Sequence, residues 1–114
     1  MKVFLIDDEP MALENLKYVI SQFEGIDILG AYTDPLDALQ RLEELKPDAV
    51  FLDIEMPQVN GFTVAEEMRR ILPDISLVFI TGFDEYAVKA FEVNAIDYVL
   101  KPVSKRRVER TIYR

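Results

Sequence analysis

The sequence predicts an α/β fold, a doubly wound five-stranded parallel sheet with helices on both faces. Short, continuous apolar runs alternate with stretches whose apolar residues recur at spacings of three and four. The first pattern is typical of buried strands and the second of amphipathic helices. The alternation repeats five times within 114 residues, a length typical of one domain. Strands that are apolar throughout are buried on both faces, as in a parallel sheet.

The first half of the chain contains three predicted strands and two predicted helices. The strands are expected at residues 3–6, 26–33 and 49–52. The helices begin at Pro10 and at Asp34-Pro35, because proline suits the first turn, where its missing amide hydrogen has no helical partner. Gly25 is expected to close the first helix and Pro47 to stop the second.

The second half contains three further helices and two strands. The helices are expected at about 62–72, at about 85–93 and from Ser104 onward, and the strands at 76–80 and about 96–100. Ser104 is a good N-cap residue for the last helix. The dipeptide Asn60-Gly61 predicts the loop before the third helix.

Composition excludes several classes of function. The chain has no cysteine and no histidine, so disulfides, thiolate or histidine zinc sites and serine–histidine triads are ruled out. A formal net charge of −8 argues against nucleic-acid binding by this domain alone. No apolar run is long enough to span a membrane, and acidic residues come too early for a signal peptide. We therefore expect a cytoplasmic protein with no membrane contact.

Polar residues follow four of the five predicted strands. The first strand ends in Asp7 and Asp8, the third in Asp53, the fourth in Thr81 and the fifth in Lys101. Ligands of doubly wound sheets bind outside the carboxyl ends of the strands. If the strand order is 2-1-3-4-5, the second strand lies at an edge and the four polar ends are neighbours.

Three converging carboxylates repel one another unless a cation binds between them. Mg²⁺ prefers oxygen ligands and is typically held by one or two carboxylates, which suits Asp8, Asp53 and the backbone carbonyl of Glu55. Asp7 would act indirectly, through local charge. The charge-neutralised Asp53 could then attack a phosphoryl group, while Thr81 and Lys101 offer donors to the phosphoryl oxygens. 

Each residue alone has a simpler explanation. Asp7 and Asp8 could favour a helix N-terminus through the dipole. Asp53 and Thr81 could be turn or cap residues, and Lys101 a surface cation. The joint placement, with each polar group between an apolar strand and a helix, favours function.

These residues resemble the receiver domain of two-component response regulators, over the whole chain. The matching positions are the acidic pair, the phosphorylated aspartate, the loop after it, the switch hydroxyl, the switch aromatic and the lysine before proline: Asp7, Asp8, Asp53, Met56, Pro57, Gly61, Thr81, Tyr98, Lys101 and Pro102. Gly82, where alanine is usual, and Val59-Asn60, where methionine and aspartate are frequent, depart from the pattern without replacing a phosphate or metal ligand.

The resemblance implies a flavodoxin-like receiver fold with strand order 2-1-3-4-5. It implies a signalling domain that is not an enzyme beyond its own phosphorylation and dephosphorylation. A sensor histidine kinase would donate a phosphoryl group to Asp53 with Mg²⁺ bound. Thr81 would then move inward, Tyr98 would follow, and the surface of the fourth helix, fifth strand and last helix would change.

Two further expectations concern the whole protein. Residues 85–98 resemble receivers attached to LytTR-type DNA-binding domains, so we expect residues 1–114 to be a receiver whose transcriptional output domain lies beyond the C-terminus. The last fourteen residues carry six of the thirteen basic residues. Acidic residues gather near the fourth helix: Asp84, Glu85, Glu92 and Asp97. Pairing of acid against base predicts a homodimer through this surface, although a solvated helix face is the simpler explanation of the basic cluster.

Two other classes remain open at this point. A phosphatase of the haloacid dehalogenase type needs a second acid two residues after a nucleophile on the first strand, which Asp7-Asp8-Glu9-Pro10 does not provide. A flavin-binding module needs a glycine- or hydroxyl-rich phosphate loop there, where this chain has acids instead.

Overall fold

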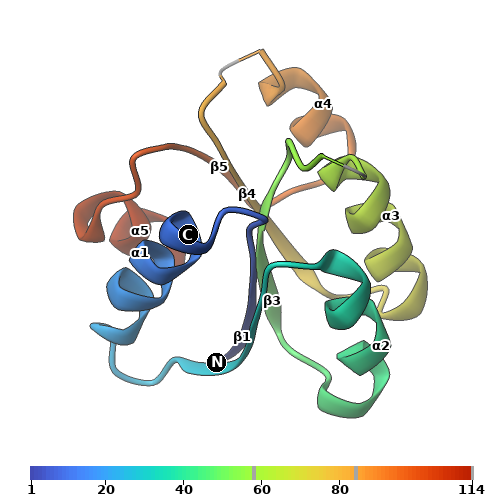
Figure 1. The fold of residues 1–114 in the computed structure, drawn as a ribbon, viewed down its shortest axis with the longest axis horizontal. Helices are drawn as coiled ribbons and strands as arrows, with labels where there is room; N and C mark the ends of the chain where they lie inside the picture. Colours follow the sequence, from blue (N-terminus) through green and yellow to red (C-terminus); the bar gives the residue numbers. More distant parts are fainter. Residues whose placement is uncertain (58, 84, 114) are drawn as a thin grey trace.

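The computed structural model describes residues 1–57, 59–83 and 85–113, and within them it confirms the predicted α/β fold (Figure 1). Strands and helices alternate along the chain. The strands are β1 (Lys2–Ile6), β2 (Asp27–Tyr32), β3 (Ala49–Asp53), β4 (Ser76–Thr81) and β5 (Asp97–Leu100). The helices are α1 (Pro10–Ser21), α2 (Pro35–Leu45), α3 (Gly61–Ile71), α4 (Ala87–Glu92) and α5 (Lys105–Ile112).

The five strands form one sheet in the order β2-β1-β3-β4-β5, and every neighbouring pair is parallel. The predicted strand order is therefore confirmed. Figure 1 shows α1 and α5 on one face of the sheet and α2, α3 and α4 on the other. Because the strands are parallel, all five carboxyl ends lie at the same edge. The order reverses between β1 and β3, which is where ligands bind in sheets of this kind.

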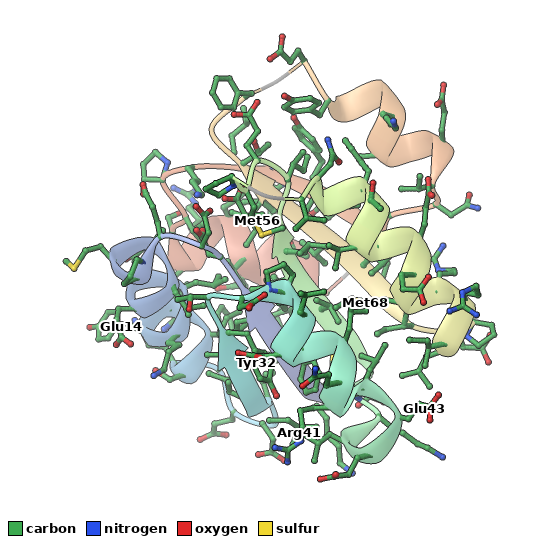
Figure 2. The ribbon with its side chains drawn as sticks, turned by 45° about the vertical axis from the view of Figure 1, so that its right-hand side comes forward. Glu14, Tyr32, Arg41, Glu43, Met56 and Met68 are labelled. Atoms are coloured by element: carbon green, nitrogen blue, oxygen red, sulfur yellow. The ribbon has the colours of Figure 1, made fainter. Side chains whose placement is uncertain are left out.

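Alternate strand residues supply the two halves of the core. On β1, Phe4 and Ile6 pack toward α2, α3 and α4, whereas Val3 and Leu5 pack toward α1 and α5. Every residue of β3 is buried, as expected for a central strand covered on both faces. Figure 2 shows Met68 of α3 in this interior. None of the helices in the described ranges has the length and apolar character needed to span a membrane.

The helix ends differ from the sequence prediction in two places. The first helix ends at Ser21 and not at Gly25, because the amide of Gln22 turns back to the carbonyl of Val19 at 3.3 Å and tightens the last turn. Gly25, with a φ of 81°, instead forms the turn into β2. The fourth helix begins at Ala87, two residues later than expected. The predicted cap of α5 is confirmed, since Ser104 Oγ accepts from the amide of Arg107 at 3.2 Å.

Candidate functional site

The carboxyl ends of β1, β3 and β5 bring three charged side chains together. Asp7 follows β1, Asp53 ends β3 and Lys101 follows β5. The Nζ atom of Lys101 lies 3.0 Å from Oδ2 of Asp7 and 3.4 Å from Oδ2 of Asp53. Asp7 and Asp53 are only 2% and 5% exposed. Lys101 therefore neutralises part of the negative charge of a buried site.

Asp8 completes an acidic cluster with the two buried aspartates. One carboxylate oxygen from each of Asp7, Asp8 and Asp53 lies within 4.8 Å of the others. Opposite oxygen ligands of a magnesium ion are separated by about 4 Å, so small side-chain rotations would bring these oxygens around one ion. One ammonium group faces three carboxylates, and net negative charge remains. The residues therefore fit a hard divalent cation in both geometry and charge.

The pKa values of Asp53 and Lys101 also indicate that the cluster favours additional positive charge. Burial raises the pKa of Asp53 to about 6, the charge of Asp7 adds to this effect, and Lys101 opposes it. Burial disfavours the charged form of Lys101, but its hydrogen bond to Asp7 and the charge of Asp53 outweigh burial and raise its pKa. The lysine therefore stays charged, whereas ionising Asp53 costs free energy when no further cation is bound.

The loop after β3 keeps Asp53 in place through a close backbone approach. The amide of Gly61 donates to the carbonyl of Ile54 at 2.8 Å. A Cβ atom on residue 61 would lie 2.3 Å from the carbonyl oxygen of Asp53 and 2.7 Å from Cα of Ile54. Only glycine lets α3 begin so near the strand end. Asn60 supports this start, because its Oδ1 accepts from the amide of Phe62 at 2.8 Å.

Glu55 lies two residues after Asp53, in the loop that follows β3. Its side chain is exposed, and Oε1 accepts a hydrogen bond from the hydroxyl of Tyr86. Its backbone forms an isolated antiparallel bridge with Asn60, which fixes the strand end that follows Asp53. The predicted use of the Glu55 carbonyl, and not its carboxylate, is compatible with this arrangement.

Thr81 and Tyr98 belong to a hydrogen-bonded path beside the acidic cluster. Thr81 is fully buried at the end of β4, and its Oγ1 accepts from the amide of Phe83 at 3.2 Å. The half-buried Tyr98 donates its hydroxyl to the carbonyl of Phe83. The same hydroxyl oxygen accepts from the amide of Tyr86 at 3.3 Å. The structure thus pairs the Thr81 hydroxyl with the segment after β4, which Tyr98 also holds.

Tyr86 was not singled out as a site residue in the sequence. Its hydrogen bond to Glu55 is the leading cause that raises the pKa of Tyr86 to about 12. The two residues are 31 positions apart and neither belongs to a strand. No spacing or period in the sequence signals this contact.

Asp97 and Arg107 form an ion pair within the chain, which corrects the expected distribution of surface charge. Asp97 is 8% exposed, and both its carboxylate oxygens accept from Arg107 at 2.9 Å. Thr111 donates its hydroxyl to Oδ2 at 2.7 Å. Burial alone would raise the pKa of Asp97, but these hydrogen bonds outweigh it and hold the pKa at about 2. Asp97 and Arg107 therefore do not belong to an exposed dimer surface; Asp84 and Arg114, also expected there, lie outside the described residues.

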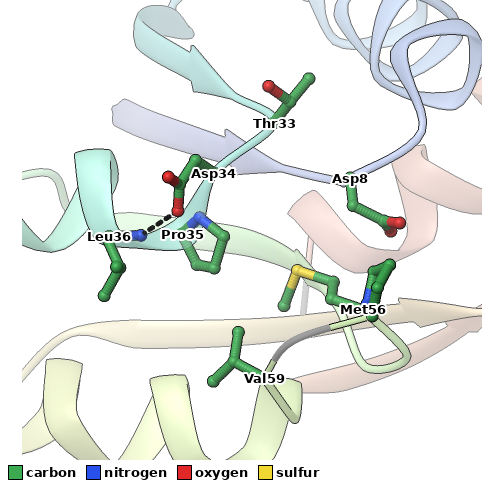
Figure 3. Close-up of a pocket in the computed structure, with 8 residues that line it drawn as sticks. Asp8, Thr33, Asp34, Pro35, Leu36, Met56 and Val59 are labelled. Carbon is green, nitrogen blue, oxygen red and sulfur yellow. Dashed lines mark hydrogen bonds between the residues drawn. The ribbon is translucent and has the colours of Figure 1, made fainter.

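A hollow of about 500 Å³ borders the acidic cluster at Asp8. Figure 3 shows it between the loops that follow β1, β2 and β3. The other lining residues are mostly apolar: Thr33, Asp34, Pro35, Leu36, Met56, Pro57 and Val59. The hydrogen bond drawn there, from the amide of Leu36 to Oδ1 of Asp34 at 2.9 Å, caps α2. Asp8 is thus accessible from solvent beside an apolar wall.

Comparisons with known proteins agree with this geometry. The family model described as response regulator receiver domain matches residues 3–113. The transcriptional regulatory protein BtsR of Salmonella typhimurium is 41% identical over 116 aligned positions, covering 100% of this chain and 47% of that protein. The sensory transduction protein LytT of Bacillus anthracis is 40% identical, covering 98% of this chain and 46% of that protein. The chain thus spans just under half the length of these relatives.

Two solved structures have the same fold. The response regulatory domain of mrkE from Klebsiella pneumoniae superposes with a TM-score of 0.89 at 37% identity, and the match covers 99% of this chain and 93% of that one. The response regulator domain of Thermotoga maritima CheB superposes with a TM-score of 0.81 at 25% identity, covering 99% and 90%. The fold therefore has close counterparts among solved structures.

Proposed function

Because the chain belongs to the response regulator receiver domain family, and is thus a signalling domain of a two-component system, we propose that Asp53 accepts a phosphoryl group from a partner histidine kinase. A carboxylate oxygen of Asp53 attacks phosphorus, and the bond from phosphorus to the imidazole nitrogen breaks with its electron pair left on nitrogen. The acyl phosphate of Asp53 results. This chain has no histidine, so the donor is another molecule. The contact of Lys101 with both Asp7 and Asp53 is the observation that carries the proposal.

The residues around Asp53 have separate roles in the proposed reaction. Asp8, Asp53 and the backbone carbonyl of Glu55 would hold Mg²⁺, and Asp7 would act indirectly, through its charge and its contact with Lys101. When bound, the ion would supply positive charge that offsets the negative charge of the carboxylates and of the phosphoryl group. Lys101 keeps its proton and turns an N–H toward a phosphoryl oxygen. 

Phosphorylation is proposed to act through Thr81 and Tyr98. The Thr81 hydroxyl leaves the amide of Phe83 and donates to a phosphoryl oxygen. Tyr98 then gives up its hydrogen bond to the Phe83 carbonyl and turns inward, which changes the surface of α4, β5 and α5. Tyr98→Ala should still accept phosphate yet fail to signal. Normal signalling by this variant would contradict the role of Tyr98.

The output is proposed to lie outside this chain. The relatives that it matches are about twice as long, and one is named a transcriptional regulatory protein. We infer that a C-terminal DNA-binding domain, of the LytTR type suggested by residues 85–98, carries the effect on transcription in the cytoplasm. The receiver itself does not bind DNA in this proposal, in line with its net charge of −8.

A homodimer through α4, β5 and α5 is proposed on a narrower set of charges than the sequence suggested. Glu85 and Glu92 are exposed near α4, and Lys105, Arg106 and Arg110 are exposed on α5. Opposite charges on the two sides of a twofold interface can pair twice. Sedimentation should show dimers once phosphodonor and Mg²⁺ are added. A protein that stays monomeric both with and without these additions would argue against this interface.

Intact mass spectrometry tests the central proposal. The protein is incubated with Mg²⁺ and acetyl phosphate, a small phosphodonor, and the expected gain is one phosphoryl group. The gain should vanish in Asp53→Ala and when the metal is chelated. Asp37→Ala, which removes an exposed acid on α2, serves as the matched control and should behave as wild type. Failure of every donor to modify the wild-type protein would defeat the proposal.

A further inference from the structure

Glu55 and Tyr86 join two segments that flank the acceptor site. Glu55 lies two residues after Asp53, and Tyr86 lies in the segment between β4 and α4. The hydroxyl of Tyr86 donates to Oε1 of Glu55. Within the described residues, no lysine or arginine forms an ion pair with Glu55. The tyrosine hydroxyl is thus the group that fixes this carboxylate.

The ring of Tyr86 is placed independently of its hydroxyl. It packs edge-on against Phe62 with ring centroids 5.9 Å apart, and against Phe83 at 6.3 Å. Such contacts survive the loss of one oxygen atom. The hydroxyl can therefore be removed without displacing the ring, which isolates the effect of its bond to Glu55.

The Glu55 carboxylate lies where its charge affects an incoming phosphodonor. Glu55, Tyr86 and Asp8 line one hollow at the mouth of the site. A phosphodonor carries negative charge, and two like charges about 6 Å apart repel measurably even in water. A carboxylate that moves freely across this mouth would slow the approach of the donor. A carboxylate held in one place, with its charge shared with a hydroxyl, hinders it less.

We propose that Tyr86 is a positioning residue that holds the Glu55 carboxylate clear of the phosphodonor's path to Asp53. This contact, the Glu55–Tyr86 latch, rests on the proposed function of Asp53. The amide of Tyr86 also donates to the hydroxyl oxygen of Tyr98 at 3.3 Å. Inward rotation of Tyr98 removes that anchor from Tyr86. The latch is therefore closed in this structure, and the proposed movement of Tyr98 would weaken its support.

A pair of variants tests the latch through the charge of Glu55. In Tyr86→Phe, phosphorylation by acetyl phosphate at low ionic strength should slow by about three- to ten-fold, and added salt should narrow the difference. In a Glu55→Gln background, the same Tyr86→Phe change should alter the rate by less than about two-fold, because the released side chain is neutral. Tyr18→Phe, at an exposed tyrosine of α1, is the control and should match wild type. An unchanged rate in Tyr86→Phe, or equal slowing in both backgrounds, overturns the latch.

A second measurement separates the latch from the proposed phosphorylation. NMR relaxation of the Glu55 side chain is recorded without Mg²⁺ or phosphodonor, in wild type and in Tyr86→Phe. The latch predicts greater mobility of Glu55 in the variant. Equal mobility overturns it, whether or not the protein accepts phosphate. If wild type accepts no phosphate but Glu55 is still more mobile in Tyr86→Phe, the proposed function is wrong. Tyr86 would then still position the Glu55 carboxylate.

Discussion

The ammonium group of Lys101 lies 3.0 Å from the carboxylate of Asp7, although β3 and β4 separate their strands in the sheet. The lysine side chain therefore reaches across the carboxyl ends of two intervening strands. On the way it also contacts Asp53, the last residue of β3. The two outer positions of the site are thus tied together over the proposed phosphate acceptor.

Lys101→Ala should damage both stability and phosphorylation. The change leaves two buried carboxylates without their cation, which we expect to cost roughly 2 kcal/mol of unfolding free energy. It also removes a donor to the phosphoryl oxygens, so the phosphorylation rate should fall at least about ten-fold. Urea unfolding and intact mass measure the two effects. Lys17→Ala, at a partly exposed lysine of α1, should change neither. A phosphorylation rate equal to wild type in Lys101→Ala would exclude Lys101 from the mechanism.

Asp53→Asn should stabilise the metal-free protein at pH 7. The pKa of Asp53 is about 6 in the folded protein, above its ordinary value of 3.8, so the folded state binds this proton more tightly than the unfolded state. This group therefore lowers stability as pH rises through 6, by roughly 2 kcal/mol at pH 7. Urea unfolding should give the variant a higher unfolding free energy than wild type at pH 7. This difference should shrink near pH 4, and also at pH 7 when Mg²⁺ is added to stabilise wild type. A wild type as stable as the variant at pH 7 without metal would contradict this.

Asp97→Asn should have the opposite effect. The pKa of Asp97 falls from its ordinary 3.8 to about 2 in the folded protein, so its contribution is present above pH 4 and is lost as pH falls through 2. We expect the variant to lose roughly 2 kcal/mol at pH 7. The difference in unfolding free energy between the variant and wild type should disappear toward pH 2. Urea unfolding at each pH measures it. Asp37→Asn provides the exposed-acid control, and a loss of similar size there would show that the buried pair is not the cause.

Gly61→Ala and Gly82→Ala form a matched pair. A Cβ on residue 61 meets the Asp53 carbonyl at 2.3 Å, whereas a Cβ on residue 82 meets nothing within 4 Å. Gly61→Ala must push the backbone of Asp53 aside, so we expect a loss of roughly 2 kcal/mol and slower phosphorylation. Gly82→Ala should be close to neutral in thermal unfolding and in intact-mass assays. Equal behaviour of the two variants would mean that the close approach is unimportant.

The sequence predicts the strands, their order and the acidic site because these follow from local patterns. Parallel strands end at one edge of a sheet, so an apolar run that stops at an aspartate places that aspartate with the others. Asp7, Asp53 and Lys101 were found in this way, and the structure brings them into contact.

Contacts between side chains of loops and helices could not be predicted in the same way. The sequence predicts opposite surface charges at Asp97 and Arg107, because spacing does not reveal that Asp97 is buried and that the two side chains pair. The sequence predicts that α1 ends at Gly25, which is an acceptable helix stop, but the backbone has already turned at Gln22. Where a helix ends and which side chains pair depend on the hydrogen bonds that form in the folded structure.

The arginine of the buried ion pair has one more partner. Arg107 donates to the carbonyl oxygen of Tyr98 at 3.0 Å, while the ring of Tyr98 packs in the core half that faces α2, α3 and α4. The guanidinium of Arg107, on α5 at the other face of the sheet, is thus hydrogen-bonded to the main chain of Tyr98, whose ring is proposed to rotate. This hydrogen bond ties the main chain of β5 to α5, so the proposed rotation of the Tyr98 ring would take place about a backbone that is held in position. If phosphorylation turns that ring as proposed, the change in the surface of α4, β5 and α5 would then come chiefly from the α4 side, while α5 stays bonded to the main chain of β5.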